Sequence, residues 1–477
     1  ITGITIGYIQ SGKTSSMEAV ANLARDLGYK IIIILSGTVG SLTRQTRDRF
    51  YKSVNGIGWK RIYIPGYLEE QLNYQKVSKE IFDSLSTWNN KILLNEEKRS
   101  VVIISMKNIP RMKKIQYLLN ALKENHGINF LKVPALIIDD ECDHYSLNTL
   151  ANQELDDEES RSGSYTGNEY ENILQDENLE EFSDRIGISI DELIALNENI
   201  DENVDDLSKF KRLKIASNES STHRRIKTLR RFFSVNSYLG YTATPYANLL
   251  ISTWNSLSPD FHQLIKTGKA YRGGEYFFPD PSSLKSETLN AENHIEWIKE
   301  SEIQSLRDFG DIPNSFKLAL RIFILGVAEG IFENDHLIYG GSSRSMMVHP
   351  SGETGKDEED YENHRHYYNI ISNFVDNLKV IFEQKIEDKT SFDNEMKEFK
   401  IAYDSLMKNN HLNEKSFPPL NQNFLECIEK SLYLIEIIEF NARSTSRIPH
   451  INWYEEGYAR ILIGGHGLDR GYTVEGL

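Results

Sequence analysis

The stretch Gly7-Tyr8-Ile9-Gln10-Ser11-Gly12-Lys13-Thr14 fits G-x-x-x-x-G-K-[ST], the pattern of the phosphate-binding loop of ATP- and GTP-hydrolysing proteins. Residues 4–6 predict a strand before this loop, and residues 15–27 predict a helix after it. In such loops the glycines let backbone N–H groups surround the phosphates, the lysine pairs with the β- and γ-phosphates, and the hydroxyl of the last residue meets magnesium. A chance glycine-rich turn is the alternative, and it does not explain the strand and helix. We therefore expect ATP and Mg²⁺ to bind here, at Gly7, Gln10, Ser11, Gly12, Lys13 and Thr14.

The 477 residues have the composition expected of a soluble globular protein, with 39% hydrophobic and 26% charged residues. No run of 18 apolar residues predicts a membrane helix, and only two cysteines occur, so we expect a cytoplasmic protein with no membrane partner. The chain begins with Ile1, almost inside the first predicted strand, and ends soon after the last one. We therefore expect residues to be missing at both ends.

The net charge of −16 comes from one segment. Residues 154–206 hold 19 acidic residues and two arginines, so the remainder is near neutral and neither demands nor forbids nucleic acid. The composition predicts disorder in the first part of this segment and two short helices between Leu179 and Asn199. We expect the insertion, residues 151–220, to be peripheral, so that deletion of residues 154–206 leaves nucleotide binding intact.

Three apolar runs, residues 31–35, 101–105 and 135–138, predict strands buried on both faces of a parallel sheet. The last is followed by Asp139-Asp140-Glu141-Cys142-Asp143-His144. Such paired acids at a strand end are typical of a magnesium and water site, in which Asp140 would hold the metal and Glu141 would polarise the attacking water. Capping of a helix is the alternative for two adjacent acids, and the phosphate loop in the same chain makes it the weaker one.

Other candidate residues also follow predicted strands. Arg44 and Arg47 follow the run at 31–35, and Lys107 and Arg111 follow the run at 101–105, where they could contact a phosphate backbone or simply begin solvated helices. Residues 238–244 predict a strand that ends in Thr242-Ala243-Thr244. These hydroxyl groups could link the nucleotide site to a neighbouring domain, or the segment could be an ordinary turn before proline.

The last predicted strand, residues 459–463, opens into a glycine-rich loop that contains Arg470. Backbone and charge in this loop could meet a phosphate, and a tight turn is the default alternative. Between these regions, residues 252–315 read as irregular, residues 316–332 as a helix and residues 432–440 as a strand.

Five stretches, taken in order, resemble the bacterial Z-one domain proteins: GYIQSGKT, IIDDECDHYSLNT, GYTATPYANLL, SMMVHPS and GGHGLDRGYTVEGL. That family is similar to superfamily-two helicase ATPases, and some members are described as endonucleases. The resemblance implies that DECD and TATP are helicase motifs two and three, and that the family works in restriction-like and anti-phage gene clusters. It covers most of the chain outside residues 151–220 and 256–315.

The resemblance also implies roles for single residues. Lys13 and Thr14 would bind phosphate and magnesium, Asp140 and Glu141 would act on metal and water, and Thr242 and Thr244 would couple hydrolysis to movement. The second domain would contribute residues to the interdomain cleft, namely Asp469, Arg470, Gly471 and Thr473, with Arg470 in a catalytic role and Asp469 and Gly471 at the ATP. This chain ends before the arginine finger that superfamily-two proteins usually carry further on.

The expected fold is α/β, with two RecA-like P-loop domains built on parallel sheets. We place the first at residues 1–255, a linker or accessory region at 256–334, and an incomplete second domain at 335–477. ATP would lie between the domains and DNA or RNA across both. The expected function is a nucleic-acid-dependent ATPase, a helicase or translocase, in a bacterial defence system with partner proteins of the same operon. The alternatives are an ATP-driven switch or scaffold that recruits effectors, and a subunit of an endonuclease complex.

Overall fold

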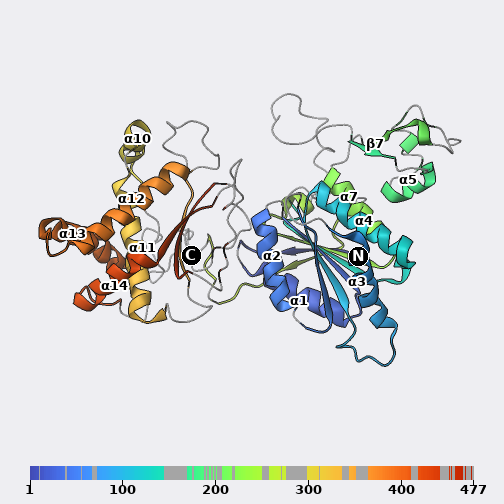
Figure 1. Cartoon of the computed structure of the whole chain (residues 1–477), viewed down its shortest axis with the longest axis horizontal. Coiled ribbons are helices and arrows are strands. Elements are labelled where there is room, and N and C mark those ends of the chain that lie inside the picture. Colours follow the sequence, from blue (N-terminus) through green and yellow to red (C-terminus); the bar gives the residue numbers. More distant parts are fainter. Residues whose placement is uncertain are drawn as a thin grey trace. The chain divides into compact units, whose positions relative to one another are not determined.

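The computed structural model divides into two compact units, Ile1–Tyr271 and Arg272–Leu477. Figure 1 shows that each unit consists of helices around a sheet. The predicted domain boundaries at residues 255 and 335 stay predictions. The structure describes residues 1–9, 11–37, 40–54, 56–66, 72–143, 169–173, 177–186, 190, 193–194, 197, 200, 207–216, 221–249, 257–269, 271–274, 298–310, 312–335, 343–350, 364–409, 417–440, 451, 453, 457–465, 468 and 474.

A parallel sheet of seven strands forms the centre of the first unit, in the order β3-β4-β2-β5-β8-β1-β9. Its central strands are the apolar runs of the sequence, and β2 is buried along its whole length, as a strand covered on both faces requires. The strands are β1 (Thr2–Ile6), β2 (Ile31–Ser36), β3 (Trp59–Tyr63), β4 (Ser100–Met106), β5 (Ala135–Asp140), β8 (Asn236–Thr242) and β9 (Phe261–Leu264).

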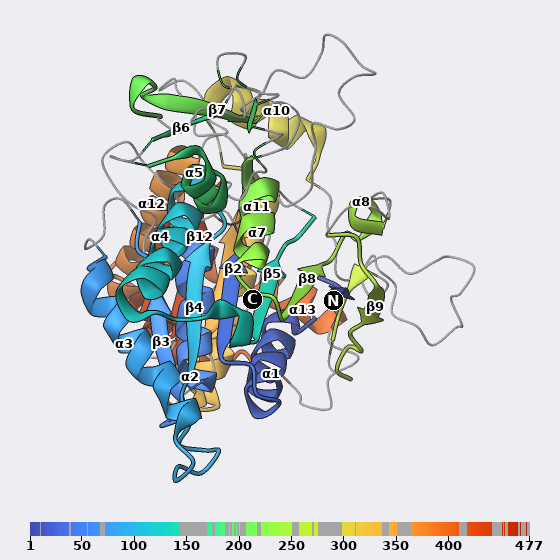
Figure 2. The ribbon, with the colours of Figure 1, turned by 90° about the vertical axis from the view of Figure 1, so that its right-hand side faces the viewer.

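Helices cover both faces of this sheet (Figures 1 and 2). On one face α1 (Lys13–Asp26) and α2 (Gly40–Ser53) pack on Ile32, Ile34 and their neighbours. On the other face lie α3 (Tyr74–Ser86), α4 (Ile109–His126) and α7 (Ser221–Arg231), which bury the alternate strand residues. This two-sided cover explains why the strands read as unbroken apolar runs instead of alternating ones.

The strand order identifies the first unit as RecA-like. The strand before the phosphate loop, β1, and the strand before the acids, β5, do not pair with each other, because β8 lies between them and pairs in parallel with both. The register places Ile6 beside Thr242 and Asp140 beside Tyr241. All three strands therefore end at one edge of the sheet, where ligands bind in open parallel sheets. The predicted fold class is confirmed.

The acidic insertion is attached to this unit through buried charge, and the expectation that nucleotide binding does not depend on it stays a prediction. Strand β6 (Glu169–Asn172) pairs with β7 (Arg212–Ala216), and α5 (Leu179–Ile186) packs with them around a small core of its own. Figure 2 shows these elements next to α4 and α7. Glu171 on β6 accepts from Lys113 on α4 at 2.5 Å and from Arg225 on α7 at 3.0 Å. The insertion thus joins two helices of the main fold.

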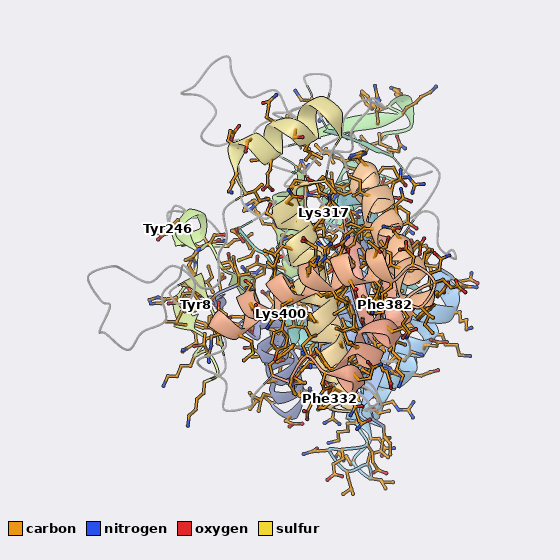
Figure 3. All side chains as sticks on the ribbon, turned by 90° about the vertical axis from the view of Figure 1, so that its left-hand side faces the viewer. Tyr8, Tyr246, Lys317, Phe332, Phe382 and Lys400 are labelled. Atoms are coloured by element: carbon orange, nitrogen blue, oxygen red, sulfur yellow. The ribbon has the colours of Figure 1, made fainter. Side chains whose placement is uncertain are left out.

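The second unit contains a parallel sheet of three strands in the order β10-β12-β11. One core lies between this sheet and its helices, and Ile461 and Ile463 point into it, whereas Leu462 points into a smaller cluster with Phe440 and Trp453. Figure 3 looks onto these helices, with Phe382 labelled among them. The elements are α10 (Glu300–Phe309), α11 (Asn314–Phe332), β10 (Arg344–Val348), α12 (His364–Glu383), α13 (Lys389–Asn409), α14 (Gln422–Leu434), β11 (Ile435–Glu439) and β12 (Ala459–Ile463).

Two local expectations differ from the structure. Residues 261–264 were expected to be irregular, but they form β9, because the exposed side of β1 leaves backbone groups that a further parallel strand satisfies. Residues 432–440 were expected to form one strand. The helix α14 instead continues to Leu434, since Phe424, Ile428 and Leu432 recur at helical spacing and are buried. Among the described residues, no helix is both long and apolar enough to cross a membrane.

Candidate nucleotide site

The phosphate loop connects β1 to the beginning of α1, as the sequence predicts. Gly12 has φ 93° and ψ 22°, a left-handed conformation that glycine adopts without strain, and it directly precedes the helix. Its carbonyl accepts from Ser16 N–H at 3.0 Å, which closes the first helical turn. The free N–H groups of this helix start lie next to the loop, where an anion is favoured.

The side chain of Lys13 folds back over the loop and donates to the carbonyls of Gly7 and Tyr8, at 3.4 and 3.1 Å. Burial lowers the pKa of the Lys13 ammonium, and the negative charges of Asp140, Glu141 and Asp143 act in the opposite direction. Lys13 therefore lies within electrostatic reach of the acids on β5 and beyond. A phosphate that approaches the loop would replace the weak carbonyl contacts with charge-assisted ones.

The loop fits a phosphate in one further respect. Ser11 Oγ is buried and has no hydrogen-bond partner among the described residues. A buried hydroxyl without a partner costs free energy, and a phosphate oxygen would satisfy it. Gly7 leaves room for this arrangement, since a Cβ there would lie 2.9 Å from both Ser11 Oγ and Lys13 Cγ.

The acids expected to hold magnesium lie at the end of β5. Asp140 is 7% exposed, and burial together with the neighbouring Glu141 raises its pKa to about 7, although Lys107 and Lys13 act to lower it. The described residues form no group of three or more His, Cys, Asp or Glu that could hold a metal. Magnesium here would depend on Asp140, Thr14 and phosphate oxygens together, which is how nucleotide sites usually hold this ion.

Glu141 adopts a backbone conformation that is uncommon for a residue with a side chain, with φ 50°. Its N–H donates to Asp140 Oδ1 at 3.1 Å. Glu141 Oε2 lies close to the end of β2, where a Cβ on Gly37 would be 3.7 Å from it. The turn therefore directs the Glu141 carboxylate toward the end of β2, at the edge of the sheet.

Lys107 lies beneath this turn and not on the surface. Its side chain is fully buried, and Nζ donates to Asp139 Oδ1 and to the carbonyls of Asp140 and Glu141, at 2.9, 2.9 and 2.8 Å. This corrects the expectation that Lys107 contacts nucleic acid, because its charge is neutralised inside the protein. Arg111 is also largely buried, and its Nη1 donates to Tyr63 OH at 3.0 Å.

The threonines of the TATP segment contact the last acid of the DECD segment. Thr242 Oγ1 donates to Asp143 Oδ1 at 2.7 Å, and Thr244 Oγ1 donates to Asp143 Oδ2. The Thr244 N–H in turn donates to Thr242 Oγ1 at 2.9 Å. The structure thus brings both threonines to the acidic turn through Asp143, a residue that the sequence analysis did not select.

Of the remaining predicted site residues, the two arginines of α2 are described by the structure and five others are not. Arg47 on α2 pairs with Asp48 at 2.8 Å, and the guanidinium groups of Arg47 and Arg111 lie 5.0 and 5.7 Å from the ring centroid of Tyr63. Arg44, on the same helix as Arg47, is half-buried. Outside the described residues lie Gln10, Asp469, Arg470, Gly471 and Thr473.

The structure also adds Tyr271, which the sequence analysis passed over. Its hydroxyl donates to the Ile9 carbonyl of the phosphate loop at 2.8 Å, and its ring stacks on Tyr8 with centroids 6.1 Å apart. Tyr8 itself is 59% exposed, and Figure 3 labels it. A single tyrosine in a stretch with few apolar neighbours gave no periodic signal that could have identified it.

Residues 315–477 match the family model of the Z1 domain, which supports the resemblance for that part of the chain. No curated protein matches the chain. Among solved structures, the crystal structure of the Pyrococcus furiosus Hef helicase domain is similar over 93% of this chain and 73% of that chain, at 13% sequence identity. The TM-score of this comparison is 0.26.

Proposed function

We propose that the first unit binds ATP with Mg²⁺ and hydrolyses it. The observation that carries this proposal is the meeting of three elements at one edge of the sheet: the phosphate loop after β1, the acids after β5 and the threonines after β8. Lys13 and Thr14 would hold the phosphates and the metal, and Asp140 would complete the metal site. The metal would neutralise charge that develops on the transferred phosphoryl group.

Glu141 is the residue that we propose to orient and polarise the attacking water. Its carboxylate projects from a turn and stays partly exposed, so a water molecule can reach it, whereas Asp139 behind it is fully buried. A second-unit arginine, Arg470, is proposed to stabilise the same transition state. Asp469 and Gly471 would complete the ATP contacts there.

We further propose that hydrolysis is coupled to DNA or RNA, as in a helicase or translocase. The direct contacts of Thr242 and Thr244 with Asp143 support this proposal, because they give any movement of the acidic turn a path to β8. Arg44 and Arg47 are the candidate phosphate-backbone contacts, whereas Arg111 is buried against Tyr63. A role in a bacterial defence system with partner proteins is proposed from the sequence resemblance, which the Z1-domain match supports for residues 315–477.

The experiment that separates motor from switch is strand displacement. The chain is incubated with ATP, Mg²⁺ and partial DNA or RNA duplexes that carry a 3′ or a 5′ single-stranded tail. A motor displaces strands from one tail polarity in the wild type and not in Lys13→Ala. Nucleic-acid-stimulated hydrolysis without displacement, and without removal of a bound protein from the strand, would favour the switch or scaffold instead.

A further inference from the structure

We propose that Lys107 is a positioning residue for ATP hydrolysis, and that it acts by fixing the backbone of the turn that carries Glu141. The inference rests on the proposed function for the identity of the reaction. It adds a role that neither the phosphate-loop pattern nor the acidic pattern assigns, because both patterns consist of residues that would touch nucleotide, metal or water.

The first support is the direction of the three hydrogen bonds from Lys107. An ammonium has three protons, and a simple buried ion pair with Asp139 would direct them mainly toward that carboxylate. Here one goes to Asp139 Oδ1 and two go to the carbonyls of Asp140 and Glu141. The charge therefore holds the two peptide groups on either side of Glu141, through the carbonyls of Asp140 and Glu141.

The second support is the conformation of this turn. Glu141 has φ 50°, which a residue with a side chain adopts only where its surroundings impose it. The Lys107 bonds bring the carbonyls of Asp140 and Glu141 to one point, which an extended residue at Glu141 would not allow, because successive carbonyls of a strand point in opposite directions. Without Lys107, the turn would lose two of the bonds that favour this conformation and keep those of the Glu141 and Cys142 N–H groups, so the direction of the Glu141 carboxylate would be less strictly fixed.

The third support is that Lys107 and its partner Asp139 are both fixed by further contacts. Its own N–H donates to Ser36 O at 3.0 Å, at the end of β2. Its partner Asp139 accepts from Tyr238 OH at 2.5 Å through the other oxygen, and the Arg230 guanidinium lies 5.6 Å from the Tyr238 ring centroid. The side chains of Lys107 and Asp139 are both fully buried. Because Lys107 has one fixed position, its hydrogen bonds can fix the backbone of the turn. Residues that hydrogen-bond to metal ligands or catalytic side chains orient those groups in the same way.

The test compares Lys107→Met with a matched control, Arg225→Met. Arg225 is also a buried cation of the first unit, paired with the buried Glu171, but it lies on α7 and contacts neither Asp140 nor Glu141. A double variant, Lys107→Met with Asp139→Leu, replaces the buried pair with apolar side chains, which usually preserves folding better than the loss of one partner. Steady-state hydrolysis gives kcat, and a fluorescent ATP analogue in EDTA gives the metal-free affinity.

We expect kcat of Lys107→Met to fall roughly 10- to 100-fold, as for other residues that support catalytic ligands. Metal-free affinity should stay within about threefold, since the phosphate loop is unchanged, and Arg225→Met should keep the wild-type kcat. Amide hydrogen exchange at residues 140–142 should become faster in Lys107→Met only. If Lys107→Met does not fold, the double variant gives the same comparison.

An unchanged kcat in folded Lys107→Met or in the double variant would overturn the inference. An equal loss in Arg225→Met would do the same, since general destabilisation would then explain the effect. A wild type that binds ATP without hydrolysing it would contradict the proposed function alone. In that case the hydrogen exchange of residues 140–142 decides on Lys107: protection that is the same in Lys107→Met as in wild type would overturn its role.

Discussion

Thr242 Oγ1 donates a hydrogen bond of 2.7 Å to Asp143 Oδ1, and this bond joins the end of β8 to the turn after β5. The two residues are 99 positions apart in the sequence, and β5 and β8 pair directly in the sheet. Because Asp143 follows Glu141 by two residues, a shift in the acidic turn on ATP binding or hydrolysis would reach Thr242 at once. We therefore expect that loss of this bond weakens the coupling between ATP hydrolysis and nucleic-acid binding.

Substitution of Thr242 by valine removes the hydroxyl and keeps the shape of the side chain. We expect Thr242→Val to bind ATP normally but to lose most of the stimulation of its ATPase by DNA or RNA. A hydrogen bond to a charged group contributes roughly 1.5–3 kcal/mol, so a loss of stability of up to about that size is also expected. The measurement is the ATPase rate with and without nucleic acid. Thr228→Val is the control, because its buried hydroxyl bonds to Ile186 O; equal stimulation in both variants would refute the coupling role.

Lys13→Ala tests the phosphate loop. We expect ATP affinity to fall roughly 10- to 150-fold, because a charge-assisted hydrogen bond to phosphate is lost, worth about 1.5–3 kcal/mol. Folding should be unaffected. Burial lowers the pKa of Lys13, which means that its charge does not stabilise the folded state, and its removal therefore costs little stability. Isothermal titration with ATP and Mg²⁺ measures the affinity. Lys60→Ala, which removes a half-exposed ion pair with Glu80, serves as the control and should bind as the wild type does.

Asp140 predicts a pH dependence of stability in the metal-free protein. Its pKa is raised from 3.8 to about 7, mainly because burial disfavours its charged form. The folded state therefore binds a proton more tightly than the unfolded state. The stability from this group is fully present below pH 3.8 and is lost as the pH rises toward 7, by about 4 kcal/mol at most.

Asp140→Asn should remove this part of the dependence. Urea unfolding of wild type and variant in EDTA between pH 5 and 8 measures it: the wild type should lose stability relative to the variant as the pH rises. Parallel curves for the two proteins would show that Asp140 is not protonated in the folded state near neutral pH.

Glu171 tests the attachment of the acidic insertion. Although burial acts to raise its pKa, the hydrogen bonds and charges of Lys113 and Arg225 hold the pKa below its ordinary value. Glu171→Gln leaves these cations without a carboxylate, and we expect the free energy of unfolding to fall by roughly 3–5 kcal/mol at pH 7. Urea unfolding measures the change, with the exposed Glu180→Gln of α5 as a control. A loss no larger than the control's would show that Glu171 does not anchor the insertion to α4 and α7.

The sequence predicted the first sheet well, because its strands are apolar runs and the phosphate-loop residues occur in a fixed spacing. It also placed Asp140 and Glu141 at a strand end, since adjacent acids after such a run are a local pattern. Strand β9 could not be predicted in the same way. Its residues Phe261 to Leu264 are exposed, so they carry no burial pattern, and only pairing with β1 makes them a strand.

The supporting contacts of the site were harder to predict because they depend on the order of strands. Lys107 looked like a surface cation, and its burial beside Asp139 follows from β2 lying between β4 and β5, with all three strand ends together. Glu171 looked like one acid among many, and its partners on α4 and α7 are more than 50 residues away. Long-range pairing of charges leaves no periodic signal in a sequence.

The most direct measurement is the steady-state ATPase rate of this chain and of Glu141→Gln, each with and without DNA or RNA. We expect the wild type to turn over ATP, faster with nucleic acid, and Glu141→Gln to bind ATP with unchanged affinity. The variant should lose turnover by roughly 2–4 kcal/mol of activation free energy, which is the usual effect of one lost catalytic contact. A wild-type rate no higher than that of Glu141→Gln under any of these conditions would contradict the assignment of the site as an ATPase.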